Sequence, residues 1–549
     1  MSGGARRAAP VKRRAVVVTG GVVAAGAVAA VAVAVWPGGA GGGGESAGAS
    51  VPSAATTKAS SASSPTAKPS PSPSRTYPLS QTPRTIPAVR QHTPARGPGW
   101  RPATGARVVV DHGGLADEGR LLAGELKLTY AGQAAPRAGD VELGLDHGTA
   151  GSESYTMTVK NGRVTITAPA DAGVFYGTRT LKQEVHGGGT APEGVVRDRP
   201  AKPQRGFMLD IARKHFTAAW IEDRVRELGD LKFNQLGLHF SDDQGFRIES
   251  DTHPEIVSKE HLTKAEVRRI LDLAASRHIT VVPEIDSPGH LGAVIAAHPD
   301  LQLRNAQGVA TRGAVDISKP AAANIVDDLL NEYADLFPGP YWHLGGDEYQ
   351  ALTVANPAVS FPQLAAAARD AYGSGASVAD LATGWLNNRA RVVSGHHRTP
   401  RAWNDGFFRG GTVQADGDIQ VAYWTGKEIG ARQPSEYLSA GRKVLNYNDE
   451  YLYYVLGQPQ TFVYPTGQRI YEQWTPLVLR GTAPVAARYD AQILGGSFAV
   501  WCDRAGAQTQ DQIAAGIRMP LRATVQKLWD PGRPALSWTD FRKLADRLG

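Results

Sequence analysis

Cysteine is almost absent from this chain of 549 residues, which contains Cys502 alone. A single cysteine excludes a disulfide framework within the chain, and no cluster of cysteine and histidine has zinc-site spacing. A lipid-carrying cysteine near the N-terminus is also missing. Stability must therefore come from packing. The hydrophobic fraction of 42% in a chain of this length is enough for more than one large core.

Clustered positive charge is scarce outside the N-terminus, although the formal net charge is +7. The clearest basic block ends at Arg13 and Arg14, so the sequence does not predict nucleic-acid binding. The uncharged stretch 15–36 then has the layout of a secretory signal or an N-terminal membrane anchor. The Arg13-Arg14 pair faintly suggests a twin-arginine signal, although its neighbours match poorly. We therefore expect a secreted or extracytoplasmic protein, with a membrane tether as the alternative.

Residues 37–98 are mostly glycine, serine, alanine, threonine and proline, and they include alternating proline and serine at 69–74. Such a composition cannot bury a core and is typical of an extended linker. We therefore divide the chain into a leader (1–36), a linker (37–98), a small α+β domain (99–200) and a larger domain (201–549). Deletion of residues 1–98 is expected to leave a folded, soluble and active protein.

The small domain is predicted from four strand patterns that begin at Arg107, Val141, Tyr155 and Val164. The last two are joined by Asn161-Gly162, a hairpin signal, and a helix is expected to begin near Asp171. No convergent set of catalytic side chains occurs in this part of the sequence. A structural role is therefore predicted for it.

The larger domain alternates strand and helix patterns, with helix starts at the capping box Thr263 to Glu266 and at Pro320. Eight strands alternating with helices predict an α/β fold, a (β/α)₈ TIM barrel with insertions. In such a barrel the reacting groups lie at the carboxyl ends of the strands. The eight expected strands are 205–211, 235–240, 280–285, 341–345, 401–404, 419–424, 443–446 and 493–501.

The fourth expected strand is followed by two glycines and then by two neighbouring carboxylates, Asp347 and Glu348. At partial burial, two such groups disfavour each other's ionisation and raise one pKa, so that one can act as an acid near neutral pH. Packing alone could explain each polar or aromatic residue at a strand end. All of them are expected at the same rim of the barrel, however, and this favours a functional site. The others at these strand ends are Asp242, Asp286, His290, Trp403, Trp424, Trp501 and Asp503.

Four motifs in order resemble the family 20 glycoside hydrolases, the β-N-acetylhexosaminidases. They are Arg205-Gly-Phe-Met-Leu-Asp, His239-Phe-Ser-Asp-Asp-Gln-Gly, Val282-Pro-Glu-Ile-Asp-Ser-Pro-Gly-His and His343-Leu-Gly-Gly-Asp-Glu. The resemblance covers residues 101–549, because the stretch 155–183 is similar to the small domain that precedes the barrel in that family. It implies the hydrolysis of terminal β-linked GlcNAc, with GalNAc as the second sugar, from chitooligosaccharides or glycans.

The resemblance also implies a retaining mechanism in which the substrate's own 2-acetamido group attacks the anomeric carbon through an oxazolinium intermediate. Glu348 would be the general acid and base, and Asp347 would orient the acetamido group. Arg205 would clamp the O3 and O4 hydroxyls of a terminal sugar. Trp403, Trp424 and Trp501 would form the pocket walls, Asp242 would also contact the sugar, and Asp286, His290 and His343 would support Glu348. No cofactor and no metal are implied.

Two positions depart from the family pattern. After the seventh strand, Tyr451-Leu-Tyr453 offers two tyrosines for one contact to the acetamido carbonyl, and the sequence does not choose between them. The eighth strand ends Trp501-Cys-Asp503, where a glutamate that holds O4 and O6 is common in the family.

Three alternatives to the monosaccharide-releasing enzyme remain open at this point. They are a lacto-N-biosidase of the same family, a divalent-metal hydrolase that uses the Asp, Glu and His cluster, and a sugar-binding module without activity. Arg205 favours the monosaccharide-releasing enzyme over a biosidase, and EDTA would separate a metal hydrolase from both.

Overall fold

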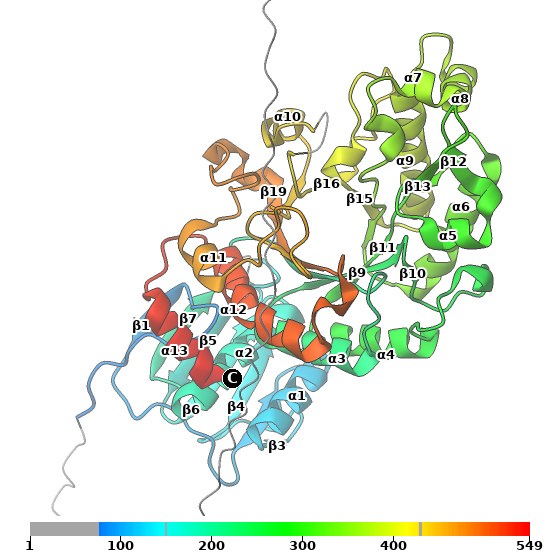
Figure 1. Cartoon of the computed structure of the whole chain (residues 1–549). Coiled ribbons are helices and arrows are strands. Elements are labelled where there is room, and N and C mark those ends of the chain that lie inside the picture. The colour runs from blue at the N-terminus through cyan, green and yellow to red at the C-terminus, as the bar shows by residue number, and fades with distance from the viewer. Residues whose placement is uncertain (1–75, 149–150, 428–430) are drawn as a thin grey trace, which may run out of the picture. The chain divides into compact units, whose positions relative to one another are not determined.

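The computed structural model describes residues 76–148, 151–427 and 431–549 (Figure 1). The expected leader, residues 1–36, and most of the expected linker lie outside the described residues. None of the described helices is long and apolar enough to cross a membrane.

The N-terminal domain is a seven-stranded mixed sheet with the strand order β1-β7-β5-β6-β4-β2-β3. Helices α1 (Ala116–Leu126) and α2 (Asp171–Gly188) pack on it, and α13 (Trp538–Leu548) from the end of the chain packs against α2 (Figure 1). The predicted strands and the Asn161-Gly162 hairpin are confirmed. The strands are β1 (Gln91–Pro94), β2 (Arg107–Val110), β3 (Thr129–Tyr130), β4 (Val141–Leu145), β5 (Tyr155–Lys160), β6 (Arg163–Ala168) and β7 (Gly194–Asp198).

The expected boundary between linker and domain at residue 98 is wrong. Residues 91–94 form β1, which pairs antiparallel with β7, from Gln91 opposite Arg197 to Pro94 opposite Gly194. Ile86 is fully buried, and its backbone makes two hydrogen bonds with the Gln183 side chain. The proline-rich composition concealed this strand, because proline at the end of an edge strand costs no ladder hydrogen bond.

The C-terminal domain is a closed ring of eight parallel strands, as predicted. Alternation along each strand separates two faces: Phe207 and Leu209 pack toward the helices, whereas Met208 joins an inner cluster with Trp403 and Trp501. The ring runs β8 (Gln204–Asp210), β9 (Gln235–Asp242), β11 (Thr280–Ile285), β14 (Tyr341–His343), β15 (Thr399–Trp403), β16 (Gln420–Tyr423), β17 (Val444–Asn446) and β19 (Ile493–Trp501).

Helices follow most barrel strands, and shorter strands extend the rim. The Thr263 capping box and the helix start at Pro320 are both present. The helices are α3 (Ala218–Asp230), α4 (Lys264–Ala275), α5 (Gly292–Ala297), α6 (Pro320–Leu336), α7 (Pro357–Ser360), α8 (Pro362–Tyr372), α9 (Val378–Gly395), α10 (Pro434–Ser439), α11 (Gly467–Gln473) and α12 (Gln510–Trp529). The added strands are β10 (Gly245–Phe246), β12 (Gln302–Arg304), β13 (Ala310–Val315) and β18 (Tyr453–Val455).

Candidate active site at the carboxyl ends of the barrel strands

The two predicted carboxylates lie where β14 ends. The turn between the strand and the pair needs glycine, because Gly345 has φ of +65° and a side chain there would collide with the Asp286 carboxylate. Glu348 itself has φ of +50°, a left-handed conformation that is uncommon for glutamate. The backbone is thus bent to present both carboxylates at the rim.

A cavity of about 360 Å³ opens beside the pair. Aromatic side chains form part of its wall and charged side chains another part, which is the composition expected of a sugar site. The predicted residues Asp347, Glu348, His290, Trp424, Tyr453, Trp501 and Asp503 all line it, together with Arg213, Thr425, Lys427, Asp449, Val455, Gln460, Thr461 and Phe462.

The structure distinguishes the two tyrosines. Tyr453 lies parallel to Trp424, with the ring centroids 5.7 Å apart and an angle of 4° between the planes. Tyr451 packs in the outer core instead, where the Arg469 guanidinium lies 4.2 Å from its ring centroid. Tyr453 is therefore the tyrosine at the cavity, and Tyr451 is placed away from it.

His290 connects the carboxylates. Its Nε2 lies 3.4 Å from Glu348 Oε2 and 3.6 Å from Asp347 Oδ2, and its Nδ1 lies 3.4 Å from Asp242 Oδ1. Burial opposes charge on the ring, but Asp242 and Asp347 hold the His290 pKa well above its usual value. The imidazolium is thus the local counter-charge to three carboxyl groups.

The two carboxylates of the pair differ in the direction of their pKa shifts. Burial, together with the neighbouring Asp286, raises the pKa of Asp347 well above its usual value. The hydrogen bond from His290 lowers the pKa of Glu348, whose side chain is 47% exposed. Burial also raises the pKa of Asp286 to about 7, while its Oδ1 accepts a hydrogen bond from the Gly346 amide at 2.8 Å. The raised pKa expected for one member of the pair belongs to Asp347.

Arg213 is the guanidinium at the cavity, and the sequence analysis missed it. It follows β8 and forms ion pairs with Asp210 at 3.0 Å and Asp242 at 2.8 Å. Asp242 was predicted to bind substrate, but it is buried and absent from the described cavity lining, so it orients Arg213 and His290. The rule that sites lie at strand carboxyl ends, applied to β8, would have identified Arg213.

The prediction that Arg205 clamps the sugar is wrong. It stands at the amino end of β8, is completely buried, and pairs with Glu153 of the N-terminal domain at 2.8 Å. Its other donors reach the carbonyl oxygens of Lys202 and Lys232. The motif identified the correct strand, β8. Its two ends lie at opposite rims of the barrel, however, and Arg205 is at the end away from the cavity.

Trp403 and His343 lie beneath the cavity rather than at it. Trp403 donates from Nε1 to Glu284 Oε1 at 2.7 Å, and it does not belong to the described lining. His343 Nδ1 lies 3.3 Å from the same Glu284 oxygen and accepts from the Gly345 amide. On the other side Glu284 faces His239 at 3.3 Å; despite burial, Glu284 and Asp242 raise the pKa of His239 to about 10. This buried network fixes the turn before Asp347.

Asp405, which the sequence did not single out, fixes the backbone at Glu348. It accepts from the Glu348 amide at 2.9 Å and from Trp424 Nε1 at 2.9 Å, and burial raises its pKa to about 6. It follows the fifth barrel strand by two residues, as Trp403-Asn-Asp in the sequence.

Comparison with known proteins agrees with this geometry. The model of the glycosyl hydrolase family 20 catalytic domain matches residues 203–517, and the model of domain 2 of the same family matches residues 82–199. A lacto-N-biosidase from Bifidobacterium bifidum is 28% identical over 486 residues, which are 87% of this chain. The alignment spans only 42% of that relative's length.

Two solved structures are similar over most of this chain. A family 20 β-N-acetylhexosaminidase from Streptomyces coelicolor has a TM-score of 0.68 at 25% identity, covering 86% of this chain and 96% of its own. A mutant Streptomyces plicatus β-hexosaminidase in complex with its product GlcNAc has a TM-score of 0.68 at 26% identity, covering 86% and 95%. Because the catalytic-domain model alone matches more than half of its residues, the chain belongs to glycosyl hydrolase family 20 and is a glycoside hydrolase.

Proposed function

We propose that the protein is an exo-acting β-N-acetylhexosaminidase that releases terminal β-linked GlcNAc, with GalNAc as the second sugar, from chitooligosaccharides or glycans. The observation that carries the proposal is the placement of Asp347, Glu348 and His290 against a cavity walled by Trp424, Tyr453 and Trp501. Its volume of about 360 Å³ lies near the lower end of ligand pockets, which suits one sugar ring better than a polymer. The apolar faces of a sugar and an acetamido methyl group stack well on such aromatic planes.

The proposed reaction retains configuration in two steps. The acetamido carbonyl oxygen attacks the anomeric carbon while the glycosidic bond breaks and Glu348 gives its proton to the leaving oxygen. Asp347 accepts a hydrogen bond from the acetamido N–H and stabilises the positive charge of the oxazolinium ion. Water then attacks the same carbon, Glu348 takes its proton, and the acetamido group is restored.

The pKa directions fit this division of roles in the following way. Asp286 and Asp347 are buried together and share the cost of ionisation, so a proton on Asp286 leaves Asp347 free to accept the acetamido N–H. Glu348 is half exposed, and a sugar that covers it would remove water from its carboxylate and raise its pKa toward that of an acid.

Arg213 is proposed to bind the hydroxyl groups of the non-reducing sugar. Its fork is already oriented by Asp210 and Asp242, and its side chain is 13% exposed at the cavity. A guanidinium held in this way donates in fixed directions, which favours a terminal sugar over one extended at those hydroxyls.

A lacto-N-biosidase is the second candidate, because the Bifidobacterium bifidum lacto-N-biosidase is similar over 87% of this chain. Asp503 lines the cavity near Arg213, and a side chain shorter than glutamate there leaves room at the sugar rim.

A panel of p-nitrophenyl glycosides tests the proposal directly. We expect turnover of β-GlcNAc and slower turnover of β-GalNAc. The β-glucoside should resist, because it lacks the acetamido nucleophile. Efficient release of intact lacto-N-biose with little action on β-GlcNAc would favour the second candidate.

Metal dependence is tested in the same assay. Asp286, His290 and Asp347 bring potential ligand atoms within 4.8 Å of one another, so a divalent-metal hydrolase has a donor set. Substrate-assisted hydrolysis predicts the same rate with and without EDTA, and a large loss with EDTA would contradict it.

Substitution of the pair separates the two roles. Glu348→Gln should slow substrates with poor leaving groups by orders of magnitude and activated aryl glycosides much less, because an aryloxide departs with little protonation. Asp347→Asn should slow both alike, since it acts on the acetamido group. The measurement is kcat/KM on both substrate types, and equal losses for Glu348→Gln would remove Glu348 as the acid.

We also propose export, supported by the basic block before the uncharged stretch 15–36. Fractionation of the producing cells, with N-terminal sequencing of the released enzyme, would distinguish a cleaved signal from a tether.

A further inference from the structure

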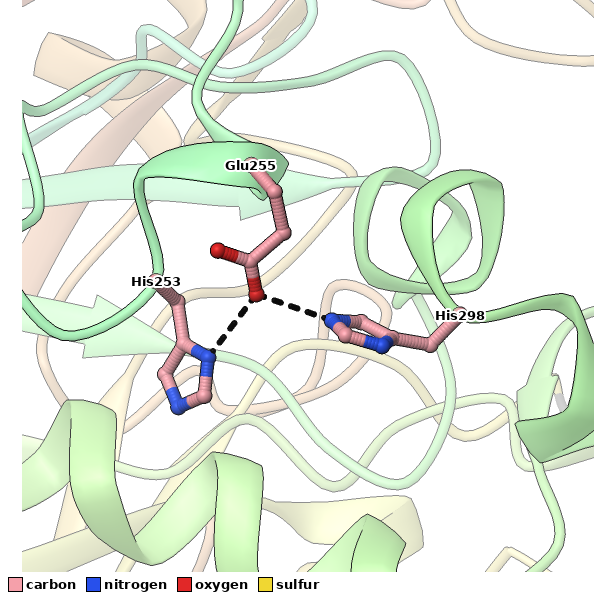
Figure 2. Close-up of side chains that lie close together, drawn as sticks. All are labelled: His253, Glu255 and His298. Carbon is pink, nitrogen blue, oxygen red and sulfur yellow. Dashed lines mark hydrogen bonds and ion pairs between the residues drawn. The ribbon is translucent and has the colours of Figure 1, made fainter.

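A second cluster of metal-ligating side chains lies on the barrel and shares no residue with the cavity. Figure 2 shows His253, Glu255 and His298 pointing toward one another. His253 and Glu255 belong to the 3₁₀ helix η2 (Pro254–Ile256) and its N-cap, and His298 caps the carboxyl end of α5. One ligand atom from each of the three lies within 4.8 Å of the others.

The distances are close to those of a bound ion. Glu255 Oε1 lies 3.0 Å from His253 Nδ1 and 2.9 Å from His298 Nε2. A tetrahedral Zn²⁺ ion bound at roughly 2.0–2.1 Å holds its ligand atoms about 3.3 Å apart. The two nitrogen-to-oxygen distances therefore need to lengthen by only a few tenths of an ångström, and the two imidazole nitrogens lie within 4.8 Å of each other. One ion would take the place of the two hydrogen bonds to Glu255.

Asp328 on α6 supplies the support that metal-bound histidines usually have. Its Oδ2 lies 3.4 Å from His253 Nε2, the ring nitrogen that does not face Glu255. Within the described part of the chain, this buried nitrogen makes no hydrogen bond. When an ion binds at Nδ1, Nε2 would carry the ring proton and donate it in a hydrogen bond to the Asp328 carboxylate.

The ligands stand on firmly held backbone. Ile256 of η2 and Val294 and Ile295 of α5 are buried in the same core, and η2 packs against α5. Glu332 of α6 accepts hydrogen bonds at 2.7 Å from both Ser250 Oγ and the Asp251 amide, which fixes the segment before His253.

The charge and exposure of the cluster also suit a cation. Glu255 places one carboxylate oxygen between two imidazole nitrogens, and a divalent cation is well suited to such a set of donors. The side chains of His253, Glu255 and His298 are 15%, 42% and 30% exposed, which allows entry of an ion.

We propose that His253, Glu255 and His298 bind one Zn²⁺ ion with water as its fourth ligand, supported by Asp328 behind His253. The set of two histidines and one glutamate matches the ligand preferences of zinc. The ion would tie η2 to the end of α5, the helix that begins two residues after His290, and so brace the segment that carries that histidine. The site does not depend on the proposed function.

Zinc chloride added to the EDTA-stripped, dialysed full chain is the test. Calorimetry should find one tight site, and the melting temperature should rise with the logarithm of zinc concentration, because the ion binds the folded state. Co²⁺ should give the visible absorption of tetrahedral coordination. Absence of both binding and a melting shift would overturn the proposal.

Matched variants assign the ion to this cluster. Glu255→Gln, which keeps the side chain's shape, and His298→Ala should abolish the shift, and Asp328→Asn should weaken zinc binding roughly 10–100-fold. His396→Ala, which removes an exposed histidine bonded to Asn331, should change nothing. Asp347→Asn tests whether zinc binds in the cavity instead. If this variant keeps the zinc-dependent rise in melting temperature, the result supports the proposal. If Asp347→Asn loses the zinc-dependent melting shift and Glu255→Gln keeps it, the ion binds in the cavity and the proposal is wrong.

Discussion

At the scale of single residues, the candidate site depends on which carboxyl group holds a proton. Asp286, which is buried, and Asp347 and Asp405, which are half-buried, have raised pKa values, whereas the pKa of Glu348 is lowered because His290 lies beside it. The raised pKa values thus belong to the carboxyl groups around Glu348 rather than to Glu348 itself.

Replacing Asp286 by asparagine should stabilise the protein at alkaline pH. Burial raises the Asp286 pKa to about 7, so between about pH 4 and that value the folded state holds a proton that the unfolded state has released. The free energy of unfolding of the wild type therefore falls as pH rises through this window. Asparagine carries no charge, so the melting temperature of Asp286→Asn should exceed that of the wild type at about pH 8.

The same comparison supplies its own control. Below about pH 3 the wild-type carboxyl is protonated in both states, and the difference should vanish. A difference in melting temperature that stays constant across the pH range would show that Asp286 does not titrate as stated.

The two tyrosines of Tyr451-Leu-Tyr453 should differ in function. Tyr453→Phe keeps the stack on Trp424 and removes one hydroxyl from the cavity, which should lower kcat/KM for p-nitrophenyl β-GlcNAc roughly tenfold to a hundredfold, as for a lost hydrogen bond at a buried polar site. Tyr451→Phe is the matched control and should leave kcat/KM unchanged. A larger loss of kcat/KM for Tyr451→Phe than for Tyr453→Phe would show that Tyr451 is the tyrosine that acts on the substrate.

Residue chemistry allowed the shared placement of Asp347 and Glu348 at the cavity to be predicted, because two glycines followed by two carboxylates at a strand end are costly for a core. It could not assign which tyrosine, tryptophan or arginine faces the cavity, since strand residues alternate between faces and the two ends of a strand reach opposite rims. The His253, Glu255 and His298 cluster was equally hidden, because its ligands come from two elements separated by more than forty positions in the sequence.

At the scale of elements, β8 serves two different ends of the barrel. Its amino end carries Arg205, which joins Glu153 of the N-terminal domain, and its carboxyl end is followed by Arg213 at the cavity. The barrel strands were predictable because each is a short apolar run followed by a break. The strands β1 and β3 were not, because they are edge strands of only four and two residues. Strand β7, which lies between β1 and β5, and helix α1 were also missed.

Arg205→Met should therefore destabilise the protein without affecting catalysis. The change leaves Glu153 without its main partner and removes the cation from the rings of Tyr176 and Trp529. We expect a loss of about 3 kcal/mol in the free energy of unfolding, the lower end for a broken buried ion pair, because Glu153 keeps Asn234 as a partner.

Urea unfolding and kinetics on p-nitrophenyl β-GlcNAc at moderate temperature would measure the two effects separately. Arg163→Met, which removes a half-exposed arginine from β6 of the N-terminal domain, should change neither. A raised KM with unaltered stability for Arg205→Met would instead support the clamp that its motif suggested.

At the scale of the whole molecule, the contacts of the segment before residue 98 decide which truncations fold. The described fold begins at Thr76, and residues 77–98 contribute a strand, a buried isoleucine and several hydrogen bonds to later elements. The Ala88 amide donates to Gln526 at 2.8 Å and the Arg90 amide to Asp198 at 3.1 Å, so this segment joins α12 and β7.

Deletion of residues 1–75 should therefore leave the unfolding transition and the activity intact, whereas deletion of residues 1–98 should lower the free energy of unfolding by at least about 3 kcal/mol. The larger deletion exposes the apolar surface that Ile86 covers and leaves Gln183 Oε1 without its donor, the Ile86 amide. Ile86→Ala in the shorter truncation isolates the first effect and should cost about 2–5 kcal/mol. Thermal and urea unfolding of the three proteins would measure these losses, and identical transitions for the two deletions would restore the linker boundary at residue 98.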